Sequence, residues 1–309
     1  MNLLFATNEA FIPGFKTALN SLCLNNPEAH EVYVANDGIP VSKQTSLELF
    51  FKPKKCNLHF VNIGKGFFNQ EPFLSLPRYN ALSMSRLAPG LIVPKGLGRL
   101  LYVDCDMIVR GSLSEFYNLD FNGKALAAIC LNRNRQDGGP YDDPESDVYS
   151  WIKYPFDPRC RYFNAGILLL NMSVFDDATP SIYEPFVETN KNQLLLADQD
   201  ILNFFFMGKV LEVVDRRLNC AIPENMRFRK GEYRWIKDNV IVLHFVVAKK
   251  PWMPWKYRNR LFHLYMAYFK KEGHPCSYIG RYLAWYFMKP WHFLAHCWRK
   301  GLSLLKGKN

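Results

Sequence analysis

The stretch Leu100-Leu101-Tyr102-Val103-Asp104-Cys105-Asp106 places two carboxylates, two residues apart, directly after a run of four apolar residues. Such a run is typical of a strand that is buried on both faces. Ligands of open parallel sheets bind at the carboxyl ends of the strands, so both aspartates stand where a ligand is expected. Their hard oxygen atoms favour Mg²⁺ or Mn²⁺.

The Asp-x-Asp spacing by itself has two interpretations. An isolated pair most often lies in a solvated turn, and the chain holds a second pair in Asp198-Gln199-Asp200. The position of Asp104 and Asp106 at the end of an apolar run favours a cation site over a turn.

Apolar runs and helical patterns alternate along the chain. Residues 15–23, for example, repeat apolar side chains at the period of one helix face. This alternation predicts an α/β fold with a mostly parallel, doubly wound sheet. Strands are predicted at residues 3–6, 32–35, 58–63, 100–103, 167–171 and 240–245, and helices at 15–23, 42–51, 79–87 and 198–207.

A long loop is predicted at residues 136–158, which are rich in Gly, Pro, Asp and Tyr. Loops of this length are often lids over a site, but a plain surface excursion is an equally good interpretation. Tyr141, Asp142 and Asp143 would cover a bound substrate in the first case, but a solvated loop is the better interpretation for these three residues.

His244 ends another apolar run, residues 240–243, and Lys250 follows six residues later. A lone histidine beside a strand is more often a core or surface residue than a ligand, although neutral imidazole also binds Mn²⁺. The ammonium group of Lys250 could lie against a phosphate. With Asp104 and Asp106, these residues make a cation and diphosphate site plausible.

The composition excludes a disordered protein, because 49% of the 309 residues are hydrophobic and 22% are charged. This length suits one large domain or two small ones. The formal net charge is +11, but residues 1–248 sum to −1 and residues 249–309 to +12. The excess positive charge therefore belongs to the C-terminal region and says nothing about the main body.

The eight cysteines are spread singly, without a Cys-x-x-Cys pair, and the sequence opens without a recognisable targeting segment. We therefore expect reduced thiols in the cytoplasm. The most apolar late segment, residues 282–298, is interrupted by Lys289 and Pro290 among others. It falls short of the roughly 20 apolar residues that span a bilayer, so no transmembrane helix is expected.

Residues 278–305 form an amphipathic pattern at the helical period, with Arg281 and Arg299 on one face and Trp291 and Trp298 on the other. A basic and aromatic helix of this kind is typical of one that lies in the interface of an anionic membrane. The alternatives are a helix packed on the main body with its basic face solvated and, less favoured, nucleic-acid binding, for which no motif is present.

Several ordered blocks make the chain resemble the family 8 retaining glycosyltransferases, which include bacterial lipopolysaccharide galactosyl- and glucosyltransferases and glycogenin. The resemblance covers about residues 1–255 and rests on the order and spacing of all the blocks. The blocks are Phe5-Ala6-Thr7, Ser85-Arg86-Leu87, Leu101-Tyr102-Val103-Asp104-Cys105-Asp106 with Gly111-Ser112-Leu113, Tyr162-Phe163-Asn164-Ala165-Gly166, Asp198-Gln199-Asp200-Ile201-Leu202-Asn203, and His244-Phe245 with Lys250-Pro251-Trp252.

The resemblance implies a GT-A fold, with a Rossmann-like, mostly parallel sheet and flanking helices. It implies that Mn²⁺, or Mg²⁺, is held on the diphosphate of a UDP-sugar by Asp104, Asp106 and His244. It also implies that Lys250 contacts the phosphates.

Further site residues follow from the same resemblance. The uridine is expected against Ala6, Asn8 and Phe11, with the ring of Phe11 stacked on uracil. The donor sugar is expected to contact Arg86, Asn164, Asp198 and Gln199, and the catalytic positions are Asp198, Gln199 and Asp200. The resemblance implies retention of configuration, and a same-face displacement is favoured because the amide of Gln199 is a poor nucleophile.

The sequence therefore predicts a catalytic domain in residues 1–255 and a basic, membrane-associating helical region in residues 256–309. The expected function is metal-dependent transfer of galactose or glucose to a glycan or glycolipid hydroxyl, in cell-surface polysaccharide or lipopolysaccharide synthesis. The expected location is the cytoplasm, on the inner face of the cell membrane, without nucleic acid as a partner. A nucleotide-sugar hydrolase and a catalytically silent membrane-binding scaffold are the alternatives.

Overall fold

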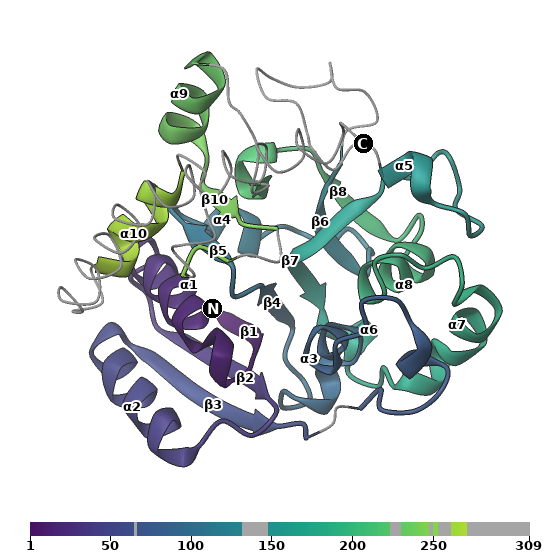
Figure 1. The fold of residues 1–309 in the computed structure, drawn as a ribbon, viewed down its shortest axis with the longest axis horizontal. Helices are drawn as coiled ribbons and strands as arrows, with labels where there is room; N and C mark the ends of the chain where they lie inside the picture. Colours follow the sequence, from purple (N-terminus) through teal and green to yellow (C-terminus); the bar gives the residue numbers. More distant parts are fainter. Residues whose placement is uncertain (65–66, 132–147, 223–229, 247–249, 253–260, 271–309) are drawn as a thin grey trace, which may run out of the picture. The chain divides into compact units, whose positions relative to one another are not determined.

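The computed structural model describes residues 1–64, 67–131, 148–222, 230–246, 250–252 and 261–270 (Figure 1). The chain divides into two compact units, of which the first comprises Met1–Pro223 and Phe228–Val246 and the second Glu224–Arg227 and Val247–Asn309. Most of the predicted loop and the whole amphipathic tail lie outside the described residues. The expected lid, the membrane-associating tail and the domain boundary at residue 255 therefore stay predictions.

A seven-stranded sheet forms the centre of the first unit, in the order β3-β2-β1-β4-β7-β6-β8 (Figure 1). β7 runs antiparallel to both of its neighbours, β4 and β6, whereas the other neighbouring pairs are parallel. This confirms the predicted α/β fold with a mostly parallel sheet. The strands are β1 (Asn2–Thr7), β2 (His30–Asn36), β3 (Cys56–Asn62), β4 (Arg99–Val103), β6 (Leu126–Cys130), β7 (Phe163–Asn171) and β8 (Val210–Val213).

Some of the α-helices begin at a side-chain cap or a proline. The side chain of Asn80 accepts a hydrogen bond from the backbone of Leu82 at the start of α3, and Pro13 stands in the first turn of α1. The helix predicted at residues 79–87 is α3 followed by a 3-10 turn, Ser85–Leu87. The helices are α1 (Ile12–Asn25), α2 (Val41–Phe51), α3 (Ala81–Met84), α4 (Ser114–Tyr117), α5 (Val148–Trp151), α6 (Met172–Phe175), α7 (Glu184–Asn190), α8 (Asp198–Phe205), α9 (Lys230–Asn239) and α10 (Phe262–Lys270).

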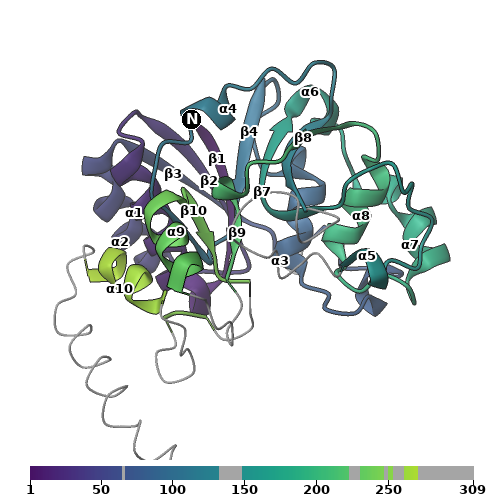
Figure 2. The ribbon, with the colours of Figure 1, turned by 90° about the horizontal axis from the view of Figure 1, so that it is seen from above.

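Alternate residues of the central strands face two separate cores. In β4, Leu100 and Tyr102 belong to one core, and Leu101 and Val103 belong to the other. Helices α3, α6, α7 and α8 contribute to the first core, and α1 and α2 contribute to the second (Figure 2). Because helices cover both faces, the central strands are apolar throughout, which is the reason for the unbroken run that precedes Asp104.

A small three-stranded sheet, in the order β5-β10-β9, forms beside the large sheet. Its strand β5 follows β4 of the large sheet, and β10 lies at the end of the first unit. Its strands are β5 (Met107–Val109), β9 (Cys220–Ala221) and β10 (Val242–His244). β10 runs antiparallel to β5, with His244 opposite Met107, and the backbone of Phe245 donates to the carbonyl of Asp106 at 2.9 Å. This pairing brings His244 next to the residues that follow β4.

In the second unit, α10 buries Tyr265 and Phe269, whose stacked rings have centroids 6.2 Å apart. The ring of Trp252 lies 6.2 Å from that of Tyr265. Among the helices that the structure describes, none has both the length and the apolar character needed to cross a membrane.

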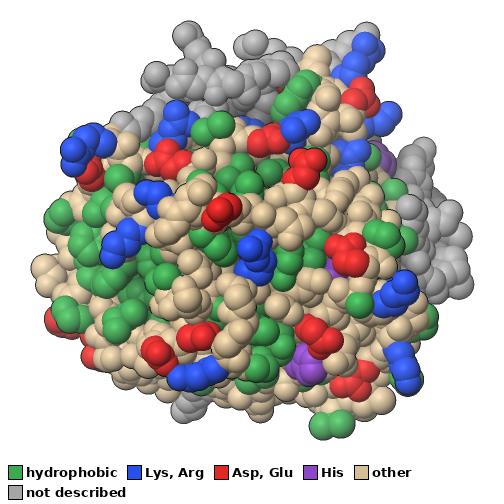
Figure 3. Space-filling model, turned by 180° about the vertical axis from the view of Figure 1, so that it is seen from behind, with side chains coloured by type: hydrophobic (Ala, Val, Ile, Leu, Met, Phe, Trp, Pro, Cys, Tyr) green, Lys and Arg blue, Asp and Glu red, His purple; other side chains and the backbone are tan. Residues whose placement is uncertain are grey.

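The charged side chains of the described surface are mixed in sign. On the face shown in Figure 3, Lys and Arg alternate with Asp and Glu, in agreement with the small net charge counted for residues 1–248. Exposed pairs such as Lys95 with Asp177, at 2.6 Å, stabilise the fold little because water screens them.

Candidate metal centre

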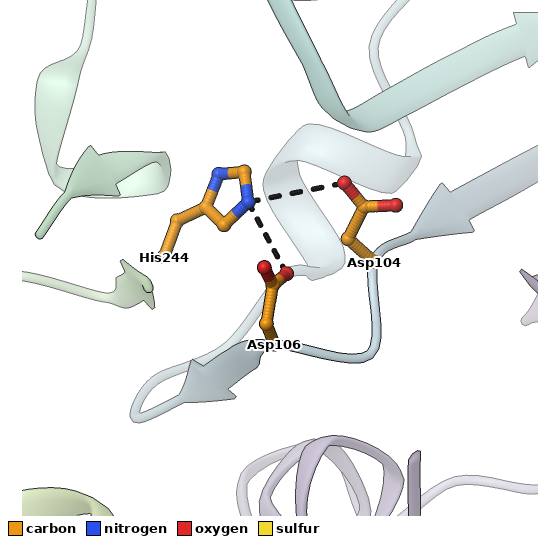
Figure 4. Close-up of side chains that lie close together, drawn as sticks. All are labelled: Asp104, Asp106 and His244. Carbon is orange, nitrogen blue, oxygen red and sulfur yellow. Dashed lines mark ion pairs between the residues drawn. The ribbon is translucent and has the colours of Figure 1, made fainter. Parts of the chain in front are cut away.

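Two aspartates and one histidine converge where the two sheets of the first unit meet. Asp104 follows β4, Asp106 precedes β5, and His244 ends β10 (Figure 4). Nε2 of His244 lies 3.2 Å from Oδ1 of Asp106 and 3.8 Å from Oδ2 of Asp104. The structure thus brings together the three residues expected to bind a metal.

These three side chains fit a divalent cation. Their ligand atoms all lie within 4.8 Å of one another, and within the described part of the chain they are the one such group. Ligands at about 2.1 Å from one Mg²⁺ are themselves about 3 to 4 Å apart, so small adjustments bring all three into a coordination shell. Two carboxylates and an imidazole are also a donor set that suits Mn²⁺ or Mg²⁺.

The carboxylate of Asp104 is held from one side. Its Oδ1 accepts hydrogen bonds from the hydroxyl of Tyr102 at 2.7 Å and from Nη2 of Arg86 at 2.9 Å. Burial raises the pKa of Asp104, Arg86 opposes this effect, and the neighbouring carboxylate of Asp106 adds to it. Since Tyr102 and Arg86 occupy Oδ1, the other oxygen is the one directed toward His244 and the candidate metal position.

Arg86 connects the metal ligands to the start of α8. Its guanidinium group donates to the carbonyl of Ala165 at 2.6 Å, and its Nε lies 3.1 Å from Oδ2 of Asp198. Burial lowers the pKa of Arg86, but the carboxylates of Asp104 and Asp198, with Tyr102, outweigh burial and raise it. Arg86 therefore stays cationic. It joins a predicted metal ligand, Asp104, to a predicted contact of the donor sugar, Asp198.

Gln199 is fixed against the first residues of β7. Its Oε1 accepts from the backbone of Ala165 at 2.9 Å, and its Nε2 donates to the hydroxyl of Tyr162 at 3.1 Å. Ala197, two residues before Gln199, has a φ of 41°, a left-handed conformation that costs a non-glycine residue energy. This strained residue, which the sequence did not indicate, directly precedes α8. The first two residues of that helix, Asp198 and Gln199, contact Arg86 and β7.

The side chain of Asp200, in the first turn of α8, is buried in the protein. Its carboxylate accepts from the hydroxyls of Tyr154 at 3.1 Å and Tyr162 at 2.7 Å, and from the backbones of Leu195 and Leu196, both at 2.8 Å. Burial raises the pKa of Asp200, and these four donors oppose that effect. The contacts assign Asp200 to the support of α8, and its expected part in catalysis stays a prediction.

Of the residues expected at the uridine, Ala6 lies beside the metal ligands, whereas Phe11 packs against the second core. The carbonyl of Ala6 accepts a hydrogen bond from the thiol of Cys105 at 3.3 Å. The side chain of Asn8 accepts from the backbone of Phe11 at 3.1 Å and caps the 3-10 turn Glu9–Phe11. The end of β1 therefore stands next to Asp104-Cys105-Asp106, as expected for neighbouring parallel strands.

Lys250 belongs to the second unit of the chain, where it is half-buried. Its expected contact with phosphate groups stays a prediction.

Gly166 is a site residue that reasoning from the sequence missed. A Cβ atom built on it would lie 2.3 Å from Cε1 of His244 and 2.7 Å from Cε of Met107, both too close for real atoms. Its carbonyl also accepts from the backbone of Asp104 at 2.8 Å. The signal in the sequence was a glycine inside an otherwise apolar strand. Such a glycine often marks a place where another group approaches the backbone closely.

Comparisons with known proteins agree with this architecture. The model of glycosyl transferase family 8 matches residues 2–256. Lipopolysaccharide 1,3-galactosyltransferase of Salmonella typhimurium is 23% identical over 268 residues, which cover 82% of this chain and 73% of that protein. General stress protein A of Bacillus subtilis is 25% identical over 270 residues, which cover 81% and 87%.

A solved structure shares the fold. Galactosyltransferase LgtC, in complex with donor and acceptor sugar analogs, superposes with a TM-score of 0.68 at 21% sequence identity. The superposition covers 91% of this chain and 100% of LgtC. The likeness shows that the sheet order and the flanking helices of the two proteins belong to one fold.

We predict that Gly166→Ala weakens Mn²⁺ binding by about tenfold or more, because the added methyl group displaces the ring of His244. The dissociation constant can be measured by electron paramagnetic resonance of free Mn²⁺ during titration. Gly231→Ala is the control, since a Cβ atom there meets nothing within 4 Å. Equal Mn²⁺ affinity in Gly166→Ala and the wild type would show that this ring is not a ligand.

Proposed function

The chain belongs to glycosyl transferase family 8, and on this basis we propose that it is a metal-dependent, retaining enzyme that transfers galactose or glucose from a UDP-sugar. The acceptor is a hydroxyl of a glycan or glycolipid. The observation that carries the proposal is the cluster of Asp104, Asp106 and His244 beside the end of β1. A cation site next to the end of the first parallel strand suits a nucleotide diphosphate.

The metal ligands would be Asp104, through Oδ2, Asp106 and His244, through Nε2. When bound, Mn²⁺ or Mg²⁺ neutralises the negative charge that develops on the diphosphate leaving group. Tyr102 and Arg86 hold the first of these carboxylates in place, and Lys250 is proposed to contact the phosphates.

The donor sugar is proposed to lie against Arg86, Asn164, Asp198 and Gln199. Arg86 contacts the carboxylate of Asp198 directly, and Gln199 contacts the backbone at Ala165, so these groups form one connected set. Fixed guanidinium, carboxylate and amide groups can bind the hydroxyls of a hexose in one orientation, which lowers the entropic part of the barrier.

Retention of configuration is proposed to proceed by displacement on the same face of the sugar. The two ends of the Gln199 amide are held by Ala165 and Tyr162, and an amide is in any case a weak nucleophile. The oxygens of Asp200 are engaged by four donors inside the protein. These contacts favour a route in which the leaving phosphate accepts the proton of the acceptor hydroxyl.

The acceptor is proposed to belong to cell-surface polysaccharide or lipopolysaccharide. This extends to the present chain what the name of the Salmonella typhimurium relative states of that protein. The basic tail at residues 277–309, which lies outside the described residues, is proposed to hold the enzyme on the anionic inner face of the cell membrane, in the cytoplasm.

Two other functions make different predictions about the same site. A nucleotide-sugar hydrolase would release UDP at a rate that no acceptor increases. A catalytically silent membrane-binding scaffold would not bind UDP saturably in the presence of Mn²⁺. The match of residues 2–256 to glycosyl transferase family 8 supports the transferase over both alternatives.

We predict that Asp106→Asn reduces Mn²⁺-dependent release of UDP from the preferred UDP-hexose by about 100-fold or more, because several kcal/mol of charge stabilisation are lost. The measurement is UDP release from UDP-galactose and UDP-glucose, with Mn²⁺ and with EDTA. Asp120→Asn is the matched control, since this residue is exposed and its carboxylate accepts a hydrogen bond from the backbone of Asn122 in its own turn.

Full activity in Asp106→Asn would rule out the metal assignment. Release that an added lipopolysaccharide acceptor does not accelerate would favour the hydrolase. The absence of both release and UDP binding in the wild type would leave the scaffold as the better account.

We also predict that removal of residues 277–309 releases the protein from anionic liposomes, because half of the excess positive charge of residues 249–309 and the interfacial tryptophans are lost. Co-sedimentation with phosphatidylglycerol vesicles measures this binding. Slow hydrolysis of the UDP-sugar should persist in the shortened protein and serves as the control for folding. Unchanged sedimentation would refute the membrane anchor.

A further inference from the structure

A chain of buried amide side chains lies behind the histidine of the metal centre. Nδ1 of His244 lies 3.0 Å from Oδ1 of Asn219, and Nδ2 of Asn219 donates to Oδ1 of Asn164 at 3.0 Å. The same oxygen of Asn164 accepts from the backbone N–H of Gly166 at 2.9 Å. The three side chains are 2% to 6% exposed, so each hydrogen bond forms away from solvent.

The direction of every hydrogen bond in this chain follows from its last member. A backbone N–H can only donate, so the side-chain atom of Asn164 that faces Gly166 must be its oxygen. Asn219 must then present its NH₂ group to Asn164, and its own oxygen consequently faces His244. An amide oxygen only accepts, so Nδ1 of His244 must carry a proton.

This protonation pattern prepares the histidine to bind a cation. A neutral imidazole carries one N–H group, and with the proton on Nδ1 the lone pair of Nε2 is directed at Asp106 and Asp104. In the other tautomer, an N–H group would point at the carboxylates and form a hydrogen bond in place of a metal bond.

We propose that Asn219, oriented by Asn164, is a positioning residue that holds His244 in the Nδ1–H tautomer and so fixes Nε2 as a metal ligand. The inference rests on the proposed function, because it takes the cluster of Asp104, Asp106 and His244 to bind a divalent cation. It also gives Asn164 a task in addition to its expected contact with the donor sugar.

An amide suits position 219 better than a carboxylate. The side chain must accept from His244 and donate to Asn164, and an amide of this length does both. An aspartate could accept from His244 but would set an oxygen against the oxygen of Asn164. It would also place a third negative charge close to the carboxylates of Asp104 and Asp106.

The backbone around Asn219 fixes its distance from His244. Asn219 directly precedes β9, which pairs in parallel with β10 so that Cys220 is opposite Leu243 and Ala221 is opposite His244. On the other side, Gly166 supplies the N–H group and, lacking a Cβ atom, leaves room for the imidazole ring. Gly166 thus sets the direction of this series of hydrogen bonds and also leaves space for the ring of His244.

The tautomer of His244 in the metal-free protein tests the proposal directly. Long-range ¹H–¹⁵N correlation spectra of protein labelled at histidine distinguish the two tautomers at about pH 9, above the ordinary histidine pKa of about 6.5. His244→Gln identifies the signals among those of the seven histidines. We expect the Nδ1–H form in the wild type, and an Nε2–H form there would overturn the proposal.

Variants at Asn219 add a readout on the metal. Asn219→Leu should shift His244 toward the Nε2–H form and weaken Mn²⁺ binding by about 10- to 100-fold. Asn219→Asp should keep the Nδ1–H form, since it again supplies an acceptor, and should bind Mn²⁺ more tightly than Asn219→Leu but less tightly than the wild type, because its second oxygen opposes the oxygen of Asn164. Asn190→Leu is the control, because it removes an equally buried asparagine that contacts only the backbone of its own helix in the hydrogen bonds seen.

A purely structural role for Asn219 gives a different result. Asn219→Leu would then lose stability but keep the wild-type tautomer and Mn²⁺ affinity, and this outcome overturns the proposal. An Asn219→Asp protein that binds Mn²⁺ no better than Asn219→Leu also overturns it. If Asn219→Leu does not fold, the wild-type tautomer and the aspartate variant decide. Failure of the wild type to bind Mn²⁺ contradicts the proposed function instead, and the tautomer measurement then still judges the hydrogen-bond chain.

Discussion

The repulsion between two neighbouring carboxylates, the half-buried Asp104 and the buried Asp106, is the constraint on which the rest of the site depends. Burial and this proximity both raise the pKa of Asp104, so the ionised pair requires positive charge close by. Arg86 supplies one fixed charge at Oδ1 of Asp104. The opposite oxygen faces His244, together with Asp106, and these atoms suit a divalent cation. The guanidinium group of Arg86 and the candidate cation position thus face different oxygens of the Asp104 carboxylate.

The reversed strand β7 makes this arrangement possible. Because β7 runs antiparallel to β4, its first residues lie at the edge of the sheet where the carboxyl end of β4 lies. A short stretch of backbone there contacts every part of the site. The carbonyl of Ala165 holds Arg86, its N–H holds Gln199, and Gly166 contacts Asp104 and makes room for His244. Changes in this stretch are therefore expected to affect metal binding and sugar binding together.

The sequence predicted those parts of the fold and site that have local signals. The apolar run before Asp104 indicated a buried strand and placed both aspartates at its end, and the family resemblance identified His244. The antiparallel direction of β7 was not predicted, because a strand buried on both faces has the same apolar pattern in either direction. Asn219 had no signal, since its role depends on contacts with residues far away in the chain. Tyr102 was indicated only as a core residue, although its hydroxyl orients Asp104.

The central claim is that Asp104, Asp106 and His244 bind one divalent cation that the donor diphosphate then shares. Anomalous diffraction at the manganese absorption edge, from crystals grown with Mn²⁺ and UDP, tests it most directly. The account predicts one strong anomalous peak bonded to Nε2 of His244 and to oxygens of both aspartates, with UDP oxygens completing its shell. A peak bonded to other residues, or UDP bound in the crystal without manganese at these three side chains, would contradict it.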